Sequence, residues 1–166
     1  NISSKKHGRK RIAYLRGPDG HEDTHWRDVG YRQALEANEI SFDPSLIGTG
    51  NYNAHDATVA INSMIVDGFD FDAVFAGDDE AASGVLRALH LSNIRVPEDV
   101  SVVGFDDGSL AAHMIPALTT VNAQVEITGY TAAKQLIKVI QHGEADPIVL
   151  LPTQLILRRS CGCNYE

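Results

Sequence analysis

The sequence has little cysteine, and the two residues that it has lie at its C-terminal end. Cys161 and Cys163 are separated by one residue, so a disulfide between them would be strained, and two thiols are too few for a structural zinc site. We therefore expect two reduced thiols on a tail outside the globular part. Such cysteine usage favours a reducing, cytoplasmic setting.

Long hydrophobic runs are also missing. No apolar stretch approaches the roughly 18 residues that span a bilayer, and the first apolar run, residues 12–15, is too short for the core of a signal peptide. We expect no membrane partner. The sequence also has no Walker A pattern and no G-x-S-x-G, so we predict a protein without catalytic residues and without a cofactor.

Positive charge is scarce outside the N-terminal end. The formal net charge is −8, and six of the 14 Lys and Arg residues lie within residues 1–16, which leaves 8 basic and 22 acidic residues in the remainder. This balance counts against nucleic-acid or anionic-lipid binding by the chain as a whole. The basic run of residues 5–11 abuts an apolar stretch without a spacer. We interpret it as the solvated end of a helix that leads into the first strand.

The remaining composition, 43% hydrophobic and 22% charged residues in a chain of 166, is that of one globular domain or one lobe of a larger one. Short β-branched runs alternate with amphipathic helical stripes, which predicts an α/β fold with a parallel, three-layer sheet. The expected strands are residues 12–15, 45–47, 73–76, 100–105, 148–151 and 155–157. The expected helices cover residues 24–38 and 125–141, and two further helices carry the apolar stripes of residues 57–65 and 82–89.

Gly- and Asp-rich loops follow four of the expected strands, at residues 16–21, 48–52, 77–80 and 106–108. Because parallel strands end at a common edge, these loops predict a ligand site at the carboxyl edge of the sheet. We expect Asp79 to cap the following helix, whereas Asp78 and Asp106 suit capping and ligand contact equally. For Trp26, the only tryptophan, core packing is the default expectation, and a position near the ligand edge would make it a useful fluorophore.

Two motifs raise the question of a metal. His21-Glu22-Asp23-Thr24-His25 matches H-E-x-x-H, but it begins where a helix is only starting and has no third ligand at a recognisable spacing, so we predict no zinc site. Asp78 and Asp106 at strand ends could instead hold Mg²⁺ in a phosphoryl-transfer enzyme. That alternative also needs a cationic side chain at a further strand end, and none is placed there.

Six motifs, in order and covering nearly the whole chain, resemble the LacI/GalR (lactose-repressor) family of transcriptional regulators. They are residues 8–18 (GRKRIAYLRGP), 27–35 (RDVGYRQAL), 74–86 (VFAGDDEAASGVL), 96–107 (VPEDVSVVGFDD), 116–121 (PALTTV) and 155–161 (LILRRSC). The resemblance implies the C-terminal part of a periplasmic-binding-protein-like effector-sensing domain, with a Rossmann- or flavodoxin-like lobe.

The resemblance also implies a division of the chain. Residues 1–10 would end a helix or crossover of the first lobe, 11–122 would form the C-terminal effector-binding lobe, and 151–166 would be a return strand and tail. The helix within 123–150 normally packs on the first lobe, which this chain lacks, so we expect it to pack on another copy, to swap or to be poorly ordered. The operator-binding helix-turn-helix would precede residue 1.

By position within these motifs, the effector-facing residues are His21, Asp23, Arg27, Tyr52, Asp78 and Asp106. Arg27 and Asp106 are the strongest candidates, because a bidentate guanidinium and a strand-end carboxylate suit sugar hydroxyls or carboxylates. We expect a sugar or nucleoside-like effector. At Asp78 the family often has Asn, and the additional acid favours a hydroxyl-rich or cationic effector.

The function implied is small-molecule effector binding and homodimerisation in an allosteric transcription regulator that is not an enzyme. Operator DNA would be a partner only through the absent helix-turn-helix. An alternative is the ligand sensor of a larger signalling protein with a kinase or cyclase output. The magnesium enzyme remains a third reading.

Overall fold

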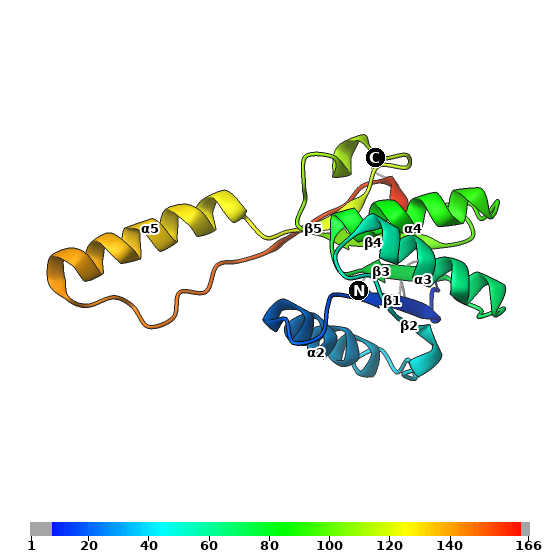
Figure 1. Cartoon of the computed structure of the whole chain (residues 1–166), viewed down its shortest axis with the longest axis horizontal. Coiled ribbons are helices and arrows are strands. Elements are labelled where there is room, and N and C mark those ends of the chain that lie inside the picture. The colour runs from blue at the N-terminus through cyan, green and yellow to red at the C-terminus, as the bar shows by residue number, and fades with distance from the viewer. Residues whose placement is uncertain (1–7, 164–166) are drawn as a thin grey trace.

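A mostly parallel β-sheet runs through the lobe (Figure 1). The computed structural model describes residues 8–163, and within them the sheet has six strands in the order β2-β1-β3-β4-β5-β6. The strands are β1 (Ile12–Arg16), β2 (Ile47–Thr49), β3 (Ala73–Ala76), β4 (Ser101–Phe105), β5 (Thr119–Asn122) and β6 (Gln154–Ile156). The first five are mutually parallel, and β6 pairs antiparallel with β5. The predicted α/β class and parallel sheet are confirmed.

Helices cover the two faces of the sheet unequally. The helices are α2 (Glu22–Glu36), α3 (Ala54–Val66), α4 (Asp79–Leu91) and α5 (Val125–His142). On one face, α3 and α4 pack over the main core, into which Leu15 of β1 projects. On the other face, α2 packs over β1, and the rings of Tyr14 and Tyr31 stack with centroids 4.9 Å apart. This alternation along β1 is that of a strand buried on both sides, and it gives the expected three layers.

Two predicted strands are wrong or displaced. Residues 44–46 form a short 3₁₀ helix, η1 (Pro44–Leu46), because Asp43 caps it and a proline occupies its first position, so β2 begins only at Ile47. Residues 148–151 are apolar but have no strand beside them; they lie in the connection from α5 to β6. Conversely, β5 was not among the predicted strands, because four residues reading TTVN are short and polar.

The N-terminal basic run is not the end of a helix where the structure describes it. Residues 8–11 have no regular structure, and Lys5 and Lys6 lie outside the described residues. Arg9 is not simply solvated either, because its guanidinium donates to the carbonyl oxygens of Pro97, Glu98 and Asp99. The charge is therefore used to hold the loop that precedes β4.

The two cysteines belong to the lobe rather than to an external tail, which corrects the prediction. Both are buried, in and after the short 3₁₀ helix η3 (Arg159–Cys161). Ser160 anchors this segment: its hydroxyl donates to the Val102 carbonyl (2.6 Å) and accepts from the Thr119 amide (2.8 Å). Burial beside β4 is a packing role that the spacing of two terminal cysteines does not reveal.

Helix α5 projects away from the rest of the lobe (Figure 1). Two residues separate it from β5, and none of its residues is buried. Its exposed apolar side chains include Leu136, Ile137 and Ile140. The expectation that it packs elsewhere stays a prediction. Among the described residues, no helix has the combination of length and apolarity needed to cross a bilayer.

Candidate functional site

The loops after β1, β2, β3 and β4 converge at the carboxyl edge of the sheet, and Tyr52 lies across them. Its hydroxyl is 2.9 Å from that of Thr24, a buried residue in the first turn of α2. The ring passes so close to Gly17 that a Cβ there would stand 2.1 Å from the Tyr52 Cζ atom. Only glycine therefore leaves room for the ring over the end of β1.

Arg27 is the centre of this edge. It lies on α2 with only 13% of its side chain exposed, and its guanidinium carbon is 5.0 Å from the centroid of the Tyr52 ring and 4.2 Å from that of Phe105. One terminal nitrogen lies 3.7 Å from an Asp106 carboxylate oxygen and 3.9 Å from one of Asp23. Two rings and two carboxylates thus hold the guanidinium in a fixed orientation.

Asp106 faces this guanidinium from the loop after β4. About half of its side chain is exposed, and partial burial raises the pKa of its carboxyl, an effect opposed by Arg27 and reinforced by Asp23. The 3.7 Å separation is an ion pair without a close hydrogen bond. A hydroxyl group could therefore bridge the two, accepting from Arg27 and donating to Asp106.

Asp78 takes the capping role that the sequence analysis favoured for Asp79. Asp78, not Asp79, is the N-cap of α4: its carboxylate accepts a 2.8 Å hydrogen bond from the Ala81 amide. Burial raises the pKa of Asp78, and the nearby Asp106 raises it further while Arg27 lowers it. Asp78 therefore lies within electrostatic reach of the Arg27–Asp106 pair although the two make no direct contact with it in the described structure.

Asp79 lies one residue into α4 and is buried. Its carboxylate accepts from the Thr120 hydroxyl and, at 2.7 Å, from the Gly108 amide. Burial raises the pKa of this carboxyl, and both hydrogen bonds counteract that rise. Capping of α4 by Asp79 is thus a wrong prediction, because its side chain points to the β4 and β5 loops instead.

The capping role of Asp78 can be tested by two substitutions. Asn is as good an N-cap as Asp, whereas Ala has no acceptor for the Ala81 amide. Asp78→Ala is expected to lower the free energy of unfolding by about 1 kcal/mol, and Asp78→Asn should stay within a few tenths of a kcal/mol of the wild type. Urea unfolding of the three proteins measures both effects. Equal losses in the two variants would show that the charge, not the cap, stabilises this turn.

His21 and Asp23 form the rim of the edge. His21 directly precedes α2, and its ring meets that of Tyr52 edge-on at 6.1 Å. Because α2 begins only at Glu22, His21 and His25 are not both inside a helix as a zinc protease would require. In the part of the chain that the structure describes, no three His, Cys, Asp or Glu side chains are grouped closely enough to hold a metal ion.

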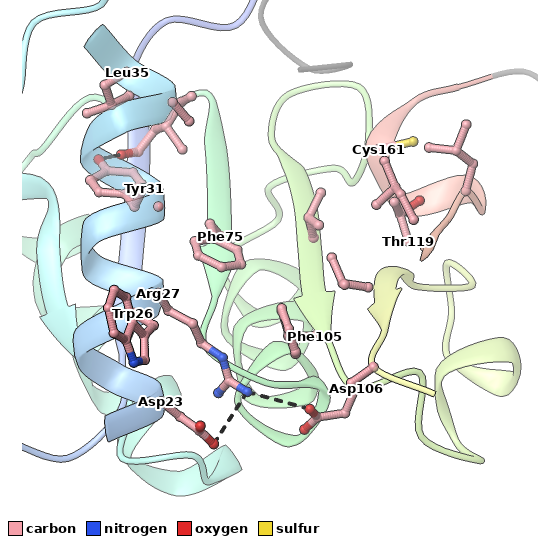
Figure 2. A pocket seen from close by; sticks show the side chains of 18 of the residues that line it. Asp23, Trp26, Arg27, Tyr31, Leu35, Phe75, Phe105, Asp106, Thr119 and Cys161 are labelled. Atoms are coloured by element: carbon pink, nitrogen blue, oxygen red, sulfur yellow. Dashed lines mark hydrogen bonds and ion pairs between the residues drawn. The ribbon is translucent and has the colours of Figure 1, made fainter. Parts of the chain in front are cut away.

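A cavity of about 850 Å³ extends from this edge along the sheet face beside α2 (Figure 2). Arg27, Asp23 and Asp106 stand at its polar end. Its remaining walls are mainly apolar and come from β1, β3, β4, β5, β6, α2, the first turn of α5 and η3. Trp26 also lines it and is 61% exposed, so the expected core position of this residue is wrong. His21, Tyr52 and Asp78 lie outside the cavity lining.

Two residues that contact Arg27 or Tyr52 were missed at the sequence level. Phe105 ends β4 and packs its ring against the Arg27 guanidinium, and Thr24 meets the Tyr52 hydroxyl. The alternation of β4 offered a signal for Phe105, because Val103 and Phe105 share the face toward α2. No signal marked Thr24, since a threonine in the first turn of a helix has many ordinary uses.

A doubly covered parallel sheet with a polar site at its carboxyl edge defines a small-molecule-binding α/β lobe. The family described as "Periplasmic binding protein-like domain" matches residues 4–161. The regulator CelR of Thermobifida fusca is 36% identical over 92% of this chain and 45% of its own length, and AscG of Escherichia coli K12 is 31% identical over 92% and 46%. The chain belongs to the periplasmic-binding-protein-like effector domains of LacI-family transcriptional regulators.

Solved structures agree with this assignment. A complex of CelR with cellobiose superposes with a TM-score of 0.88 at 35% identity, covering 95% of this chain and 48% of CelR. The Lac repressor bound to ONPG in its repressed state gives 0.88 at 29% identity, covering 95% and 47%. The chain therefore spans about half the length of these regulators and corresponds to the C-terminal part of their sensing domain.

Proposed function

We propose that the carboxyl edge binds a neutral sugar through Arg27 and Asp106. The observation that carries the proposal is the 3.7 Å ion pair between these residues, flanked by the rings of Tyr52 and Phe105. A sugar hydroxyl both donates and accepts hydrogen bonds, so it can satisfy a guanidinium and a carboxylate together. The partly exposed ring of Tyr52 offers the apolar contact that the C–H face of a pyranose needs.

The charge balance of the edge favours a neutral effector over an anionic one. Asp23 and Asp106 pair with the Arg27 guanidinium, and Asp78 adds negative charge within electrostatic reach. The other arginine of this region, Arg16, is paired with Asp19 and Asp28. A phosphate or carboxylate would meet more negative than positive charge in a partly desolvated site. The cellobiose complex of CelR, a relative at 35% identity, supports the same chemical class.

Within a regulator, we infer that this lobe closes on the sugar together with a second lobe, and that α5 packs on that second lobe. The exposed apolar residues of α5 need such a partner, because burying each large side chain stabilises by about 1.5–3 kcal/mol. The protein would act without catalysis, as a homodimer in the cytoplasm, and would reach operator DNA through a helix-turn-helix that is not part of these residues.

The proposal is tested by titrating the chain with cellobiose, glucose and glucuronate. Trp26 is the only tryptophan and lines the cavity beside Arg27, so its fluorescence reports occupancy of the polar end. We expect a saturable change with cellobiose and weaker binding of glucuronate than of glucose, because the two monosaccharides differ by one carboxylate. The proposal fails if no neutral sugar gives a saturable change, or if glucuronate binds more tightly than glucose.

A further inference from the structure

Asp107, the neighbour of the effector-facing Asp106, joins three segments of the chain. One carboxylate oxygen is 2.7 Å from an Arg158 guanidinium nitrogen, and the other accepts a 2.8 Å hydrogen bond from the Asn122 side chain. The three residues come from the loop after β4, from the end of β5 and from the segment after β6. The Asp107 and Arg158 side chains are only 15% and 20% exposed, so their ion pair is partly shielded from water.

These two partners stand where the chain leaves the lobe and where it comes back. Asn122 is the last residue of β5, and α5 begins at Val125. Arg158 lies two residues beyond β6, on the returning segment, where its amide and the Thr119 hydroxyl are 2.8 Å apart. Between these points, α5 and the connection from α5 to β6 project from the lobe (Figure 1), whereas β6 pairs with β5 in the sheet. The Asp107 carboxylate thus holds both ends of the projecting part.

The backbone at this point is strained. Asp106 has φ of 108° and Asp107 has φ of 55°, conformations that non-glycine residues adopt at a cost and that persist only where surrounding contacts hold them. The Asp106 amide donates to the Val121 carbonyl at 2.8 Å, which fixes one side of the loop. The Gly108 amide donates to Asp79 and fixes the other. Between these anchors, the Asp107 amide donates to the Thr120 hydroxyl at 3.3 Å, and the Asp107 carboxylate makes the ion pair and hydrogen bond that hold its side chain.

We propose that Asp107 is a positioning residue that holds the Asp106 carboxylate toward the effector. Asp107 also couples the position of Asp106 to the two connecting segments, which lead into α5 at Asn122 and return from it at Arg158. The proposal rests on the function inferred above for Arg27 and Asp106. Releasing Asp107 from Arg158 and Asn122 lets the strained pair relax, and Asp106 then loses its separation of 3.7 Å from Arg27. Because linkage is reciprocal, a sugar held by Asp106 restrains the two segments as much as they restrain Asp106.

The first test is a double-mutant cycle on cellobiose affinity. Asp107→Asn removes the charge that pairs with Arg158 and is expected to weaken cellobiose binding about tenfold, from the usual effect of a charge-assisted hydrogen bond. If Asp107 acts through Asp106, the same substitution made in an Asp106→Asn background should change the affinity less than twofold. Equal losses in both backgrounds would show an independent structural effect and overturn the proposal.

A matched control is available at the opposite end of β4. Asp99 pairs with Arg95 as closely as Asp107 pairs with Arg158, but it precedes the strand and touches neither connecting segment. Asp99→Asn should leave cellobiose affinity unchanged. If it weakens binding as much as Asp107→Asn does, loss of any ion pair near β4 is sufficient and the assigned role of Asp107 is wrong.

The second test needs no sugar and so separates this proposal from the proposed function. Amide hydrogen exchange is measured on the free wild type, Asp107→Asn and Asp99→Asn. In Asp107→Asn, exchange of residues 106–108, 120–124 and 157–159 should accelerate about tenfold or more, whereas Asp99→Asn should affect only residues around 95–100. Unchanged exchange at 120–124 and 157–159 overturns the coupling even if cellobiose binds. If exchange accelerates but no sugar binds, the role of Asp107 in holding the two connecting segments is supported and the effector assignment is refuted.

Discussion

Replacing Arg27 with alanine is expected to weaken cellobiose binding by about 100-fold, the largest effect that a single side chain of this site should have. The substitution removes the only cation that the described structure places against Asp23 and Asp106 and leaves those carboxylates without their partner. A charge-assisted hydrogen bond contributes roughly 1.5–3 kcal/mol, and the unpaired acids add a further cost. Trp26 fluorescence or calorimetry measures the change in dissociation constant.

Arg32 provides the matched control on the same helix. It also stacks its guanidinium on a ring, with its central carbon 3.9 Å from the centroid of Phe42, but it lies away from the carboxyl edge and the 850 Å³ cavity. Arg32→Ala should therefore leave the dissociation constant within twofold of the wild-type value. Equal losses in the two variants would mean that α2 as a whole, not the Arg27 guanidinium, determines binding. An unaffected Arg27→Ala would remove the basis of the site.

The location of the site could be predicted from the sequence, because it depends on short-range patterns. The strands β1 to β4 are each followed within three residues by glycine, and β1, β3 and β4 also by aspartate. A parallel sheet places all those loops at one edge. Arg27, Tyr52 and Asp106 meet there for that reason. Their separations depend on the packing of α2, which the sequence pattern does not specify.

The partners of individual aspartates could not be predicted, because they depend on contacts between distant segments. Asp107 pairs with Arg158, 51 residues away, and Asp79 binds Thr120 across the sheet. At the sequence level, four aspartates in two adjacent pairs look interchangeable. In the structure, Asp78 caps a helix, Asp79 is a buried hydrogen-bond acceptor, Asp106 pairs with Arg27 at the carboxyl edge, and Asp107 binds Asn122 and Arg158. Each role follows from which neighbour the backbone brings within 4 Å.

Gly84→Ala should be the most destabilising small substitution in the lobe. Gly84 lies on α4 where that helix packs against α3, and a Cβ there would stand 2.1 Å from the carbonyl oxygen of Ala54. That oxygen is part of the backbone and cannot turn aside, so the two helices must separate. We expect a loss of about 3 kcal/mol or more in the free energy of unfolding, equivalent to roughly 10 °C in Tm for a domain of this size.

The close packing of α3 and α4 also positions a hydrogen bond that Gly84→Ala should break. The Thr58 hydroxyl donates to the carbonyl of Ala54 at 2.7 Å within α3 and lies 3.1 Å from that of Gly84 on α4. Gly30→Ala is the matched control, because Gly30 is also inside a helix but a Cβ there meets no atom within 4 Å. It should stabilise by about 0.5–1 kcal/mol through helix propensity alone. If thermal unfolding shows Gly84→Ala to be no less stable than Gly30→Ala, α3 and α4 do not pack as closely as their backbones indicate.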